Sequence, residues 1–202
     1  MRKGILGGTF DPIHNGHLEI GRAAARSLCL DQVILLPSGF SYFKKDRADR
    51  MMDPMVRYEM TVLASAADSL FTVSDIECRR SGNTYTSETL QIMKDSDPES
   101  SLFFITGADA LMGMRKWHDP EVLFSLCTVA VCSRGDQVAP EELDNEIRYL
   151  TGKYGAMIEQ VRIPDIPISS EMIRRQLRNG IPISGLVPEN VENYITENRL
   201  YI

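Results

Sequence analysis

Apolar runs of strand length alternate with amphipathic stretches of helical length along the whole chain. The apolar runs lie at 5–6, 32–36, 71–76, 102–106, 128–132 and 157–163, and the helical stretches at about 16–28, 54–67, 87–94, 140–149, 169–178 and from 188 onward. The runs 102–106 and 128–132 contain no charged residue, which is typical of parallel strands covered on both faces. The alternation predicts an α/β fold built on a doubly wound parallel sheet.

The sequence gives no sign of a second domain. Its 202 residues contain no internal repeat, low-complexity tract or linker, so we expect a single domain over 1–202, in which 165–202 forms a small C-terminal helical segment. The least regular stretch, 37–53, is expected to be a long loop. In an open α/β sheet, ligands bind beyond the carboxyl ends of the strands, which directs attention to the turn after the first strand.

Composition and charge narrow the classes of protein and partner. No apolar run approaches the roughly 20 residues that span a bilayer, and glycine and aspartate interrupt the first apolar residues too early for a signal peptide. The four cysteines form no CxxC pair, so we expect reduced thiols in a cytoplasmic protein rather than a zinc site. A net charge of −6 argues against a broad nucleic-acid surface. Small anionic substrates remain compatible with local basic clusters, Lys44-Lys45 and Arg174-Arg175.

The turn after the first strand reads GGTFDPIHNGH, from Gly7 to His17. Two glycines allow a sharp turn and a close approach of the backbone to a ligand, and the N–H groups that open the next helix form a site for an anion. His14 and His17 are three residues apart and can point at the same anion. Neither the P-loop pattern nor the dinucleotide-binding glycine pattern is present. Taken alone, two such histidines without a third metal ligand are more often ordinary polar loop residues.

A second phosphate-binding segment is predicted near residue 169. The sequence ISSEMIRRQLRNG places Ser169 and Ser170 at the start of a helix and Arg174 one turn inside it. Serine hydroxyls satisfy open N–H groups at a helix start, and a guanidinium binds phosphate through two donors. By itself the segment is equally compatible with an ordinary capped helix.

Together the two segments closely resemble the signature motifs of the HxGH nucleotidylyltransferase superfamily: HNGH stands for HxGH, and ISSEMIR for an ISSTxIR sequence. The resemblance implies a Rossmann-like nucleotidyltransferase fold in which the segment 165–202 completes an ATP site. Three intervening segments, NTYT at 83–86, GAD at 107–109 and KWH at 116–118, are similar to those of the bacterial nicotinate mononucleotide adenylyltransferases. The resemblance then covers nearly the whole chain, in the same order, down to the terminal ENRLYI.

The resemblance implies a site shared by ATP and a pyridine mononucleotide. The implied ATP contacts are Gly7, Gly8, Thr9, Phe10, His14, His17, Gly107, Asp109, Arg134, Ser169, Ser170 and Arg174, and the implied mononucleotide contacts are Lys45, Tyr85, Thr86, Trp117 and His118. Trp117, the only tryptophan, offers a flat apolar partner for a pyridine ring, although a lone tryptophan is more often a core residue. Backbone N–H groups near Thr86 and His118 would take the nicotinate carboxylate. Asp109 is also compatible with a turn former, and Arg134 with a solvated loop residue.

The implied reaction is an in-line attack of the mononucleotide 5′-phosphate on the α-phosphorus of ATP, which releases pyrophosphate and forms deamido-NAD for NAD biosynthesis. The attacking phosphate is largely ionised at neutral pH, so the protein needs no general base and only aligns phosphates and neutralises charge. The residues suited to these roles are His14, His17, Lys44 or Lys45, and Arg174. Mg²⁺ would be carried by the ATP phosphates, and no metal site formed by the protein is expected.

Two positions depart from the family pattern. Glu171 stands where threonine is usual and adds negative charge beside a triphosphate, so either its side chain points away or ATP binds more weakly. Where many members carry a PPHK-like segment, this chain reads PSGFSYFKK from Pro37 to Lys45, which keeps a lysine but lacks the histidine. Two alternatives stay open: the same chemistry on nicotinamide mononucleotide or another phosphorylated acceptor, and an inactive nucleotide-binding paralogue. No nucleic-acid or membrane partner is expected, and the sequence is compatible with a homo-oligomer.

Overall fold

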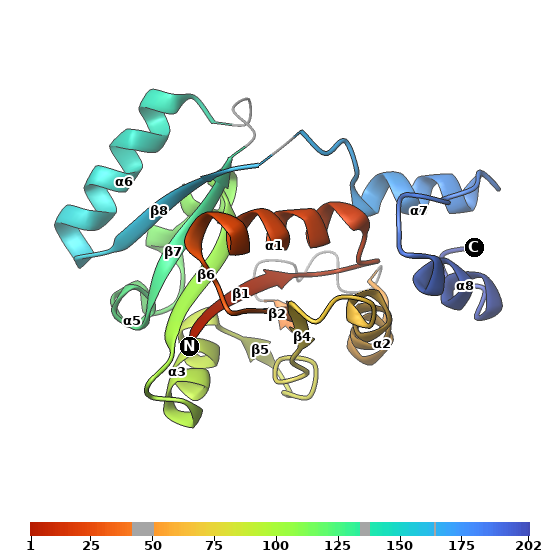
Figure 1. Ribbon diagram of the computed structural model, residues 1–202, viewed down its shortest axis with the longest axis horizontal. Helices are drawn as coiled ribbons and strands as arrows, with labels where there is room; N and C mark the ends of the chain where they lie inside the picture. The colour runs from red at the N-terminus through yellow and green to blue at the C-terminus, as the bar shows by residue number, and fades with distance from the viewer. Residues whose placement is uncertain (42–50, 134–137, 164) are drawn as a thin grey trace.

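A six-stranded parallel sheet forms the centre of the computed structural model, which describes residues 1–41, 51–133, 138–163 and 165–202 (Figure 1). The strands are β1 (Arg2–Gly8), β2 (Gln32–Pro37), β4 (Phe71–Val73), β6 (Ser101–Gly107), β7 (Cys127–Ser133) and β8 (Met157–Arg162). Their spatial order is β4-β2-β1-β6-β7-β8, and every neighbouring pair is parallel. This is the order of a doubly wound sheet, and each strand coincides with a predicted apolar run, so the predicted fold class is confirmed.

Helices cover both faces of the sheet. One face carries α1 (Asn15–Leu28), α2 (Pro54–Ser65), α7 (Ser170–Arg178) and α8 (Glu189–Glu197), and the other carries α3 (Thr86–Ser96), α4 (Ala108–Leu111), α5 (Pro120–Leu126) and α6 (Pro140–Tyr154). Successive strand residues alternate between the two cores: Ile5 packs with the α3 side and Leu6 with the α1 side. β6 and β7 are therefore buried on both sides, as their uninterrupted apolar runs predicted, whereas most of β8 at the edge of the sheet is exposed.

Several short elements were not predicted. β3 (Phe40–Ser41) pairs in parallel with β5 (Asn83–Thr84) to form a second, two-stranded sheet, and α4, α5 and a 3-10 turn (Met114–Lys116) follow β6. These elements are too short to show hydrophobic periodicity in the sequence. They nonetheless build much of the site described below.

The C-terminal part returns to the beginning of the chain. The backbone N–H of Asn15 donates to the carbonyl of Leu186 at 2.9 Å, and its side-chain amide donates to the carbonyl of Gly185 at 2.8 Å. Figure 1 shows α7 and α8 at the end of the molecule that also carries α2. Among the helices that the structure describes, none has the length and apolar composition that crossing a bilayer requires.

Candidate functional site

Two pockets open at the carboxyl edge of the sheet, on either side of the β1–α1 turn. The aromatic pocket is lined by Gly7, Gly8, Leu36, Ser38, Glu77, Thr84, Tyr85, Thr86, Phe104, Thr106, Ala110, Trp117 and His118. The arginine cleft is lined by Thr9, Phe10, Asp11, His17, Met51, Ser170, Glu171, Arg174, Arg175 and Arg178. Gly8 and Thr9, which are consecutive, thus face different pockets. Both lie at the end of β1, beside the switch point between β1 and β6 where doubly wound sheets bind their ligands.

The local backbone explains why the turn needs its glycines. Phe10 adopts a left-handed conformation with φ of 49°, which is strained for a residue with a side chain. A Cβ atom on Gly8 would lie 2.5 Å from the ring of Phe10, so only glycine fits there. The ring of Phe10 is buried and meets the imidazole of His17 edge-on, with centroids 4.8 Å apart.

The two histidines of the turn lie against each other. Their rings stack with centroids 3.7 Å apart, and the backbone N–H of His14 donates to Nδ1 of His17 at 3.3 Å. Because Nδ1 of His17 accepts a hydrogen bond, the neutral ring carries its proton on Nε2, which makes that atom a donor. His17 lines the arginine cleft, whereas His14 is 5% exposed and does not line either pocket. The structure therefore brings both predicted residues together but presents only His17 to the cleft.

The arginine cleft has an excess of positive charge. Its lining includes three arginines of α7, Arg174, Arg175 and Arg178, and two carboxylates, those of Asp11 and Glu171. Arg174 donates to the backbone carbonyl of Asp11, and its Nη1 lies 3.9 Å from a carboxylate oxygen of Asp11. Such a cluster of guanidinium groups beside a histidine favours a polyanion.

At the start of α7, Ser169 caps the helix as the sequence predicted, whereas Ser170 makes a different contact. Ser169 is the N-cap, and its hydroxyl accepts a hydrogen bond from the N–H of Met172 at 3.1 Å. The hydroxyl of Ser170 donates to the carbonyl of Pro12 at 2.9 Å, which joins α7 to the first turn. Glu171 is exposed and is one of the residues that line the cleft.

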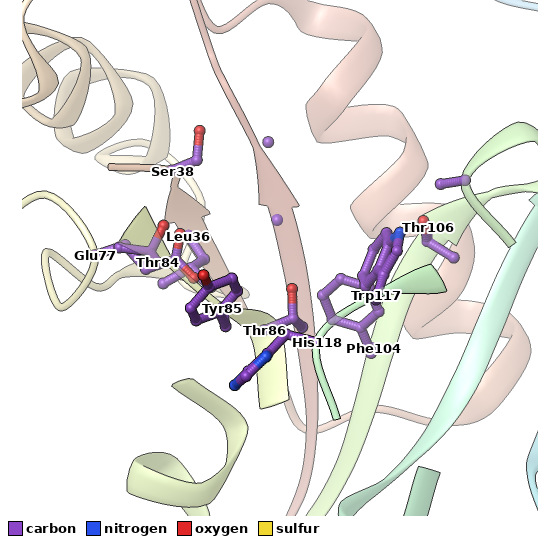
Figure 2. Close-up of a pocket in the computed structure, with 13 residues that line it drawn as sticks. Leu36, Ser38, Glu77, Thr84, Tyr85, Thr86, Phe104, Thr106, Trp117 and His118 are labelled. Carbon is purple, nitrogen blue, oxygen red and sulfur yellow. The ribbon is translucent and has the colours of Figure 1, made fainter. Parts of the chain in front are cut away.

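Flat side chains line the aromatic pocket in two groups, Tyr85 with His118 and Phe104 with Trp117 (Figure 2). The half-buried ring of Trp117 meets Phe104 edge-on, with centroids 6.0 Å apart at 80°. Tyr85 and His118 stack at 4.1 Å, and the hydroxyl of Ser87 donates to the carbonyl of His118 at 3.1 Å. Trp117 thus packs against the core and faces the pocket at once, which combines the two interpretations of a lone tryptophan.

The N-terminus of α3 also opens into the aromatic pocket. Tyr85 is the N-cap and Thr86 the first helical residue, and both line the pocket. The N–H groups of a first helical turn have no acceptor within the helix, and the helix dipole adds positive potential there. This end of the pocket is therefore suited to a carboxylate.

Two buried charged residues of the site were not singled out by the sequence. Arg57 of α2 is fully buried, and its guanidinium donates to the carbonyl oxygens of Thr9 at 2.6 Å, Ser38 at 2.6 Å and Met52 at 3.0 Å. Burial lowers the pKa of Arg57. The available signal was an arginine one turn before Met60, on the apolar face of the predicted helix.

The second such residue, Glu77, is 6% exposed and lines the aromatic pocket. One carboxylate oxygen accepts a hydrogen bond from the hydroxyl of Thr89 at 2.9 Å. Burial raises the pKa of Glu77. Glu77 lies in an irregular segment after β4, where the sequence carried no periodic signal.

Two further predicted site residues that the structure describes, Gly107 and Asp109, line neither pocket. Gly107 ends β6, one residue beyond Thr106 of the aromatic pocket, and Asp109 lies in the first turn of α4 and is exposed. Lys44, Lys45 and Arg134 lie outside the described residues. Within the described ranges, no three His, Cys, Asp or Glu side chains are placed to hold a metal ion.

Comparisons with known proteins show which family and which fold this chain resembles. The cytidylyltransferase-like family model matches residues 5–176. A protein of Clostridium beijerinckii named "Probable nicotinate-nucleotide adenylyltransferase" is 41% identical, over 99% of this chain and 98% of that protein, and one of Tropheryma whipplei with the same name is 39% identical, over 97% of each. Plasmodium falciparum nicotinic acid mononucleotide adenylyltransferase complexed with NaAD has the same fold, with a TM-score of 0.78 and 19% identity over 99% of this chain and 97% of that one.

Proposed function

This chain belongs to the cytidylyltransferase-like family and, within it, to the nicotinate-nucleotide adenylyltransferases, and we propose that its two pockets bind ATP and nicotinate mononucleotide side by side. It is an enzyme that transfers AMP from ATP to nicotinate mononucleotide, giving deamido-NAD and pyrophosphate. The observation that carries the assignment of the pockets is their shared wall: Gly8 faces the aromatic pocket, and Thr9 faces the arginine cleft. Two phosphates bound in these pockets meet over the β1–α1 turn.

The arginine cleft is proposed to hold the triphosphate of ATP. His17 donates through Nε2, Arg174 supplies a guanidinium held against Asp11, and Ser170 and Thr9 line the same cleft. The stacked ring of His14 and the N–H of His14 keep His17 in this orientation. The predicted ATP contacts Gly107, Asp109 and Arg134, and the predicted phosphate contact Lys44, are kept as parts of this proposal.

The aromatic pocket is proposed to hold the pyridine mononucleotide. Trp117 offers its indole face to the ring, and a cationic pyridinium adds a cation–π interaction. The nicotinate carboxylate would lie at the N-terminus of α3, near the N–H groups of Thr86 and His118. An amide in the same place gains less from the helix dipole than a carboxylate, so we propose that the acid is the preferred acceptor. Lys45 is proposed to contact the mononucleotide as well.

Catalysis then requires alignment and charge neutralisation. An oxygen of the ionised 5′-phosphate forms a bond to the α-phosphorus of ATP in line with the bond to the leaving oxygen, and pyrophosphate departs. Nε2–H of His17 and the guanidinium of Arg174 stabilise the negative charge that gathers on the leaving group. No proton has to be removed from the nucleophile, which agrees with a cleft formed by donors rather than by a general base.

Mg²⁺ is proposed to enter as part of the MgATP substrate. The arginine cleft contains two carboxylates, and Asp11 already contacts Arg174 and accepts a hydrogen bond from the hydroxyl of Tyr201 at 2.6 Å. Burial, and then the charge of Asp11, raise the pKa of Tyr201, which keeps its hydroxyl protonated for this bond. A cleft of this composition suits a metal ion that keeps its waters and is held by phosphates.

The test is pyrophosphate release from MgATP with nicotinate mononucleotide, measured in parallel with nicotinamide mononucleotide. We expect release with the acid and much slower release with the amide. Equal rates with both acceptors would contradict the proposed place of the carboxylate. Release with neither acceptor would contradict the proposed reaction.

A further inference from the structure

One peptide group in the wall of the aromatic pocket contacts a buried charge at each end. The carbonyl oxygen of Ser38 accepts a hydrogen bond from Nη2 of Arg57 at 2.6 Å, and the N–H of the same peptide, which belongs to Gly39, donates to the carboxylate of Glu77. The cation faces the negative end of the peptide dipole and the anion faces its positive end. Both charges therefore favour the same orientation of this peptide.

Arg57 connects the 38–39 peptide to the wall of the arginine cleft through its other guanidinium nitrogens. While Nη2 bonds to Ser38, Nη1 donates to the carbonyl of Thr9 at 2.6 Å, and Nε donates to the carbonyl of Met52 at 3.0 Å. Ser38 lines the aromatic pocket and Thr9 lines the cleft. Because a guanidinium is planar, its donors keep fixed directions, and one side chain sets the position of both carbonyl groups.

Glu77 connects the same peptide to the end of the aromatic pocket that lies at the N-terminus of α3. Its carboxylate accepts hydrogen bonds from the hydroxyl groups of Thr84 and Thr89, and the hydroxyl of Thr89 also reaches the carbonyl of Tyr85 at 3.2 Å. A Cβ atom on Gly39 would lie 2.2 Å from the carbonyl oxygen of Glu77, so the close approach of the two segments requires glycine. Hydrogen bonds thus run from Thr9 through Arg57, the 38–39 peptide and Glu77 to the start of α3.

Buried charges at this place are costly for folding. Arg57 is fully buried and Glu77 is 6% exposed, and neither has a direct carboxylate or ammonium partner among the ion pairs of the described residues. Apolar residues of similar volume often stabilise a protein more than buried charges do. A role in the site explains why both charges are present.

We propose that Arg57 and Glu77 are positioning residues that fix the aromatic pocket relative to the arginine cleft, and so align the acceptor phosphate with the α-phosphorus of ATP. This inference rests on the proposed function. Neither side chain needs to touch the reacting atoms, because Arg57 acts through the 38–39 peptide and the carbonyl of Thr9, and Glu77 acts through the same peptide and through Thr89 of α3. A misplacement of about 1 Å between two reacting groups is enough to cost on the order of 10²-fold in rate.

The experiment compares Arg57→Lys and Glu77→Gln with the wild-type chain and with Arg22→Lys as a matched control. Lysine keeps the charge of Arg57 but cannot reach three carbonyl groups, and glutamine keeps the shape of Glu77 but removes its charge. Arg22 of α1 pairs with Asp68 at 2.9 Å and lines neither pocket. For each protein we would measure kcat for pyrophosphate release, and, by calorimetry, the affinity and stoichiometry for a non-hydrolysable ATP analogue and for nicotinate mononucleotide, each added alone.

We expect kcat to fall about 10²-fold in Arg57→Lys and about 10-fold in Glu77→Gln, while both dissociation constants stay within about 3-fold and every site remains occupied. Arg22→Lys should behave like the wild type.

A purely structural role would instead lower the binding stoichiometry in step with kcat, and that result would overturn the proposal. A wild-type kcat in Glu77→Gln would also overturn the proposal. This outcome can be measured even if Arg57→Lys does not fold. If the wild type released no pyrophosphate, the proposed function would fail and this inference with it, whereas an active wild type with unaffected variants would refute the inference alone.

Discussion

The two pockets meet at the β1–α1 turn but are built in different ways. The arginine cleft takes nearly all of its lining from the turn 9–17 and from α7, and its charged residues on α7 are exposed or half-buried, whereas Asp11 of the turn is buried. The aromatic pocket is assembled from many short stretches between Gly7 and His118, and the charged residue in its wall, Glu77, is buried. A site for phosphates can thus be encoded in two contiguous motifs, whereas the site for the acceptor depends on how distant segments pack.

The largest effect is expected in the cleft. His17→Ala removes the Nε2 donor proposed for the leaving phosphates, and kcat should fall about 10³-fold because a preorganised donor acts on the transition state. The thermal midpoint should stay close to that of the wild type, since His17 is only partly buried. The same exchange at His118, in the aromatic pocket, should mainly raise KM for the mononucleotide. A parallel loss of folding and activity in His17→Ala would show that His17 is structural.

The aromatic pocket is expected to respond in binding rather than in rate. Trp117→Leu keeps the apolar contact with Phe104 but loses the flat face proposed for the pyridine, so KM for nicotinate mononucleotide should rise about 10-fold. KM for ATP should not change, because Trp117 lines only the aromatic pocket. Steady-state kinetics with each substrate varied in turn would measure both values, and Trp117→Phe should retain most of the affinity. A rise in both KM values would mean that the two pockets are not separate binding sites.

A smaller effect is expected from Glu171, the residue that departs from the family pattern in the cleft. Glu171→Thr removes a negative charge from the lining, so KM for MgATP should fall about 3-fold at low ionic strength. Because the side chain is exposed, the gain should shrink as salt is added. The acceptor KM serves as the internal control and should stay constant. An unchanged KM for MgATP at low salt would mean that the carboxylate lies far from the bound phosphates.

The contrast between the pockets also explains what the sequence predicted and what it did not. The parallel sheet could be predicted from apolar runs such as 102–106. The cleft could be predicted from two short motifs, because within each motif the groups that line the cleft are close together in the sequence. Arg57 and Glu77 were missed because their partners, Ser38 and Gly39, are distant in the sequence and offer backbone atoms. A pattern of residue types carries no signal for a hydrogen bond to a carbonyl or N–H group of another segment.

The last prediction concerns how the stability of the protein depends on pH through the buried carboxyl group of the aromatic pocket, Glu77. Burial raises the pKa of Glu77 above its ordinary value of 4.5. Below that value the carboxyl group is protonated in both the folded and the unfolded chain; as pH rises through the higher pKa of the folded state, the free energy of unfolding falls, because the unfolded chain releases its proton more readily. Glutamine does not titrate, so the thermal midpoint of Glu77→Gln minus that of the wild type should increase as pH rises above 4.5, measured in parallel thermal melts. A difference between Glu77→Gln and the wild type that narrows with rising pH would mean that the folded protein favours the ionised carboxylate.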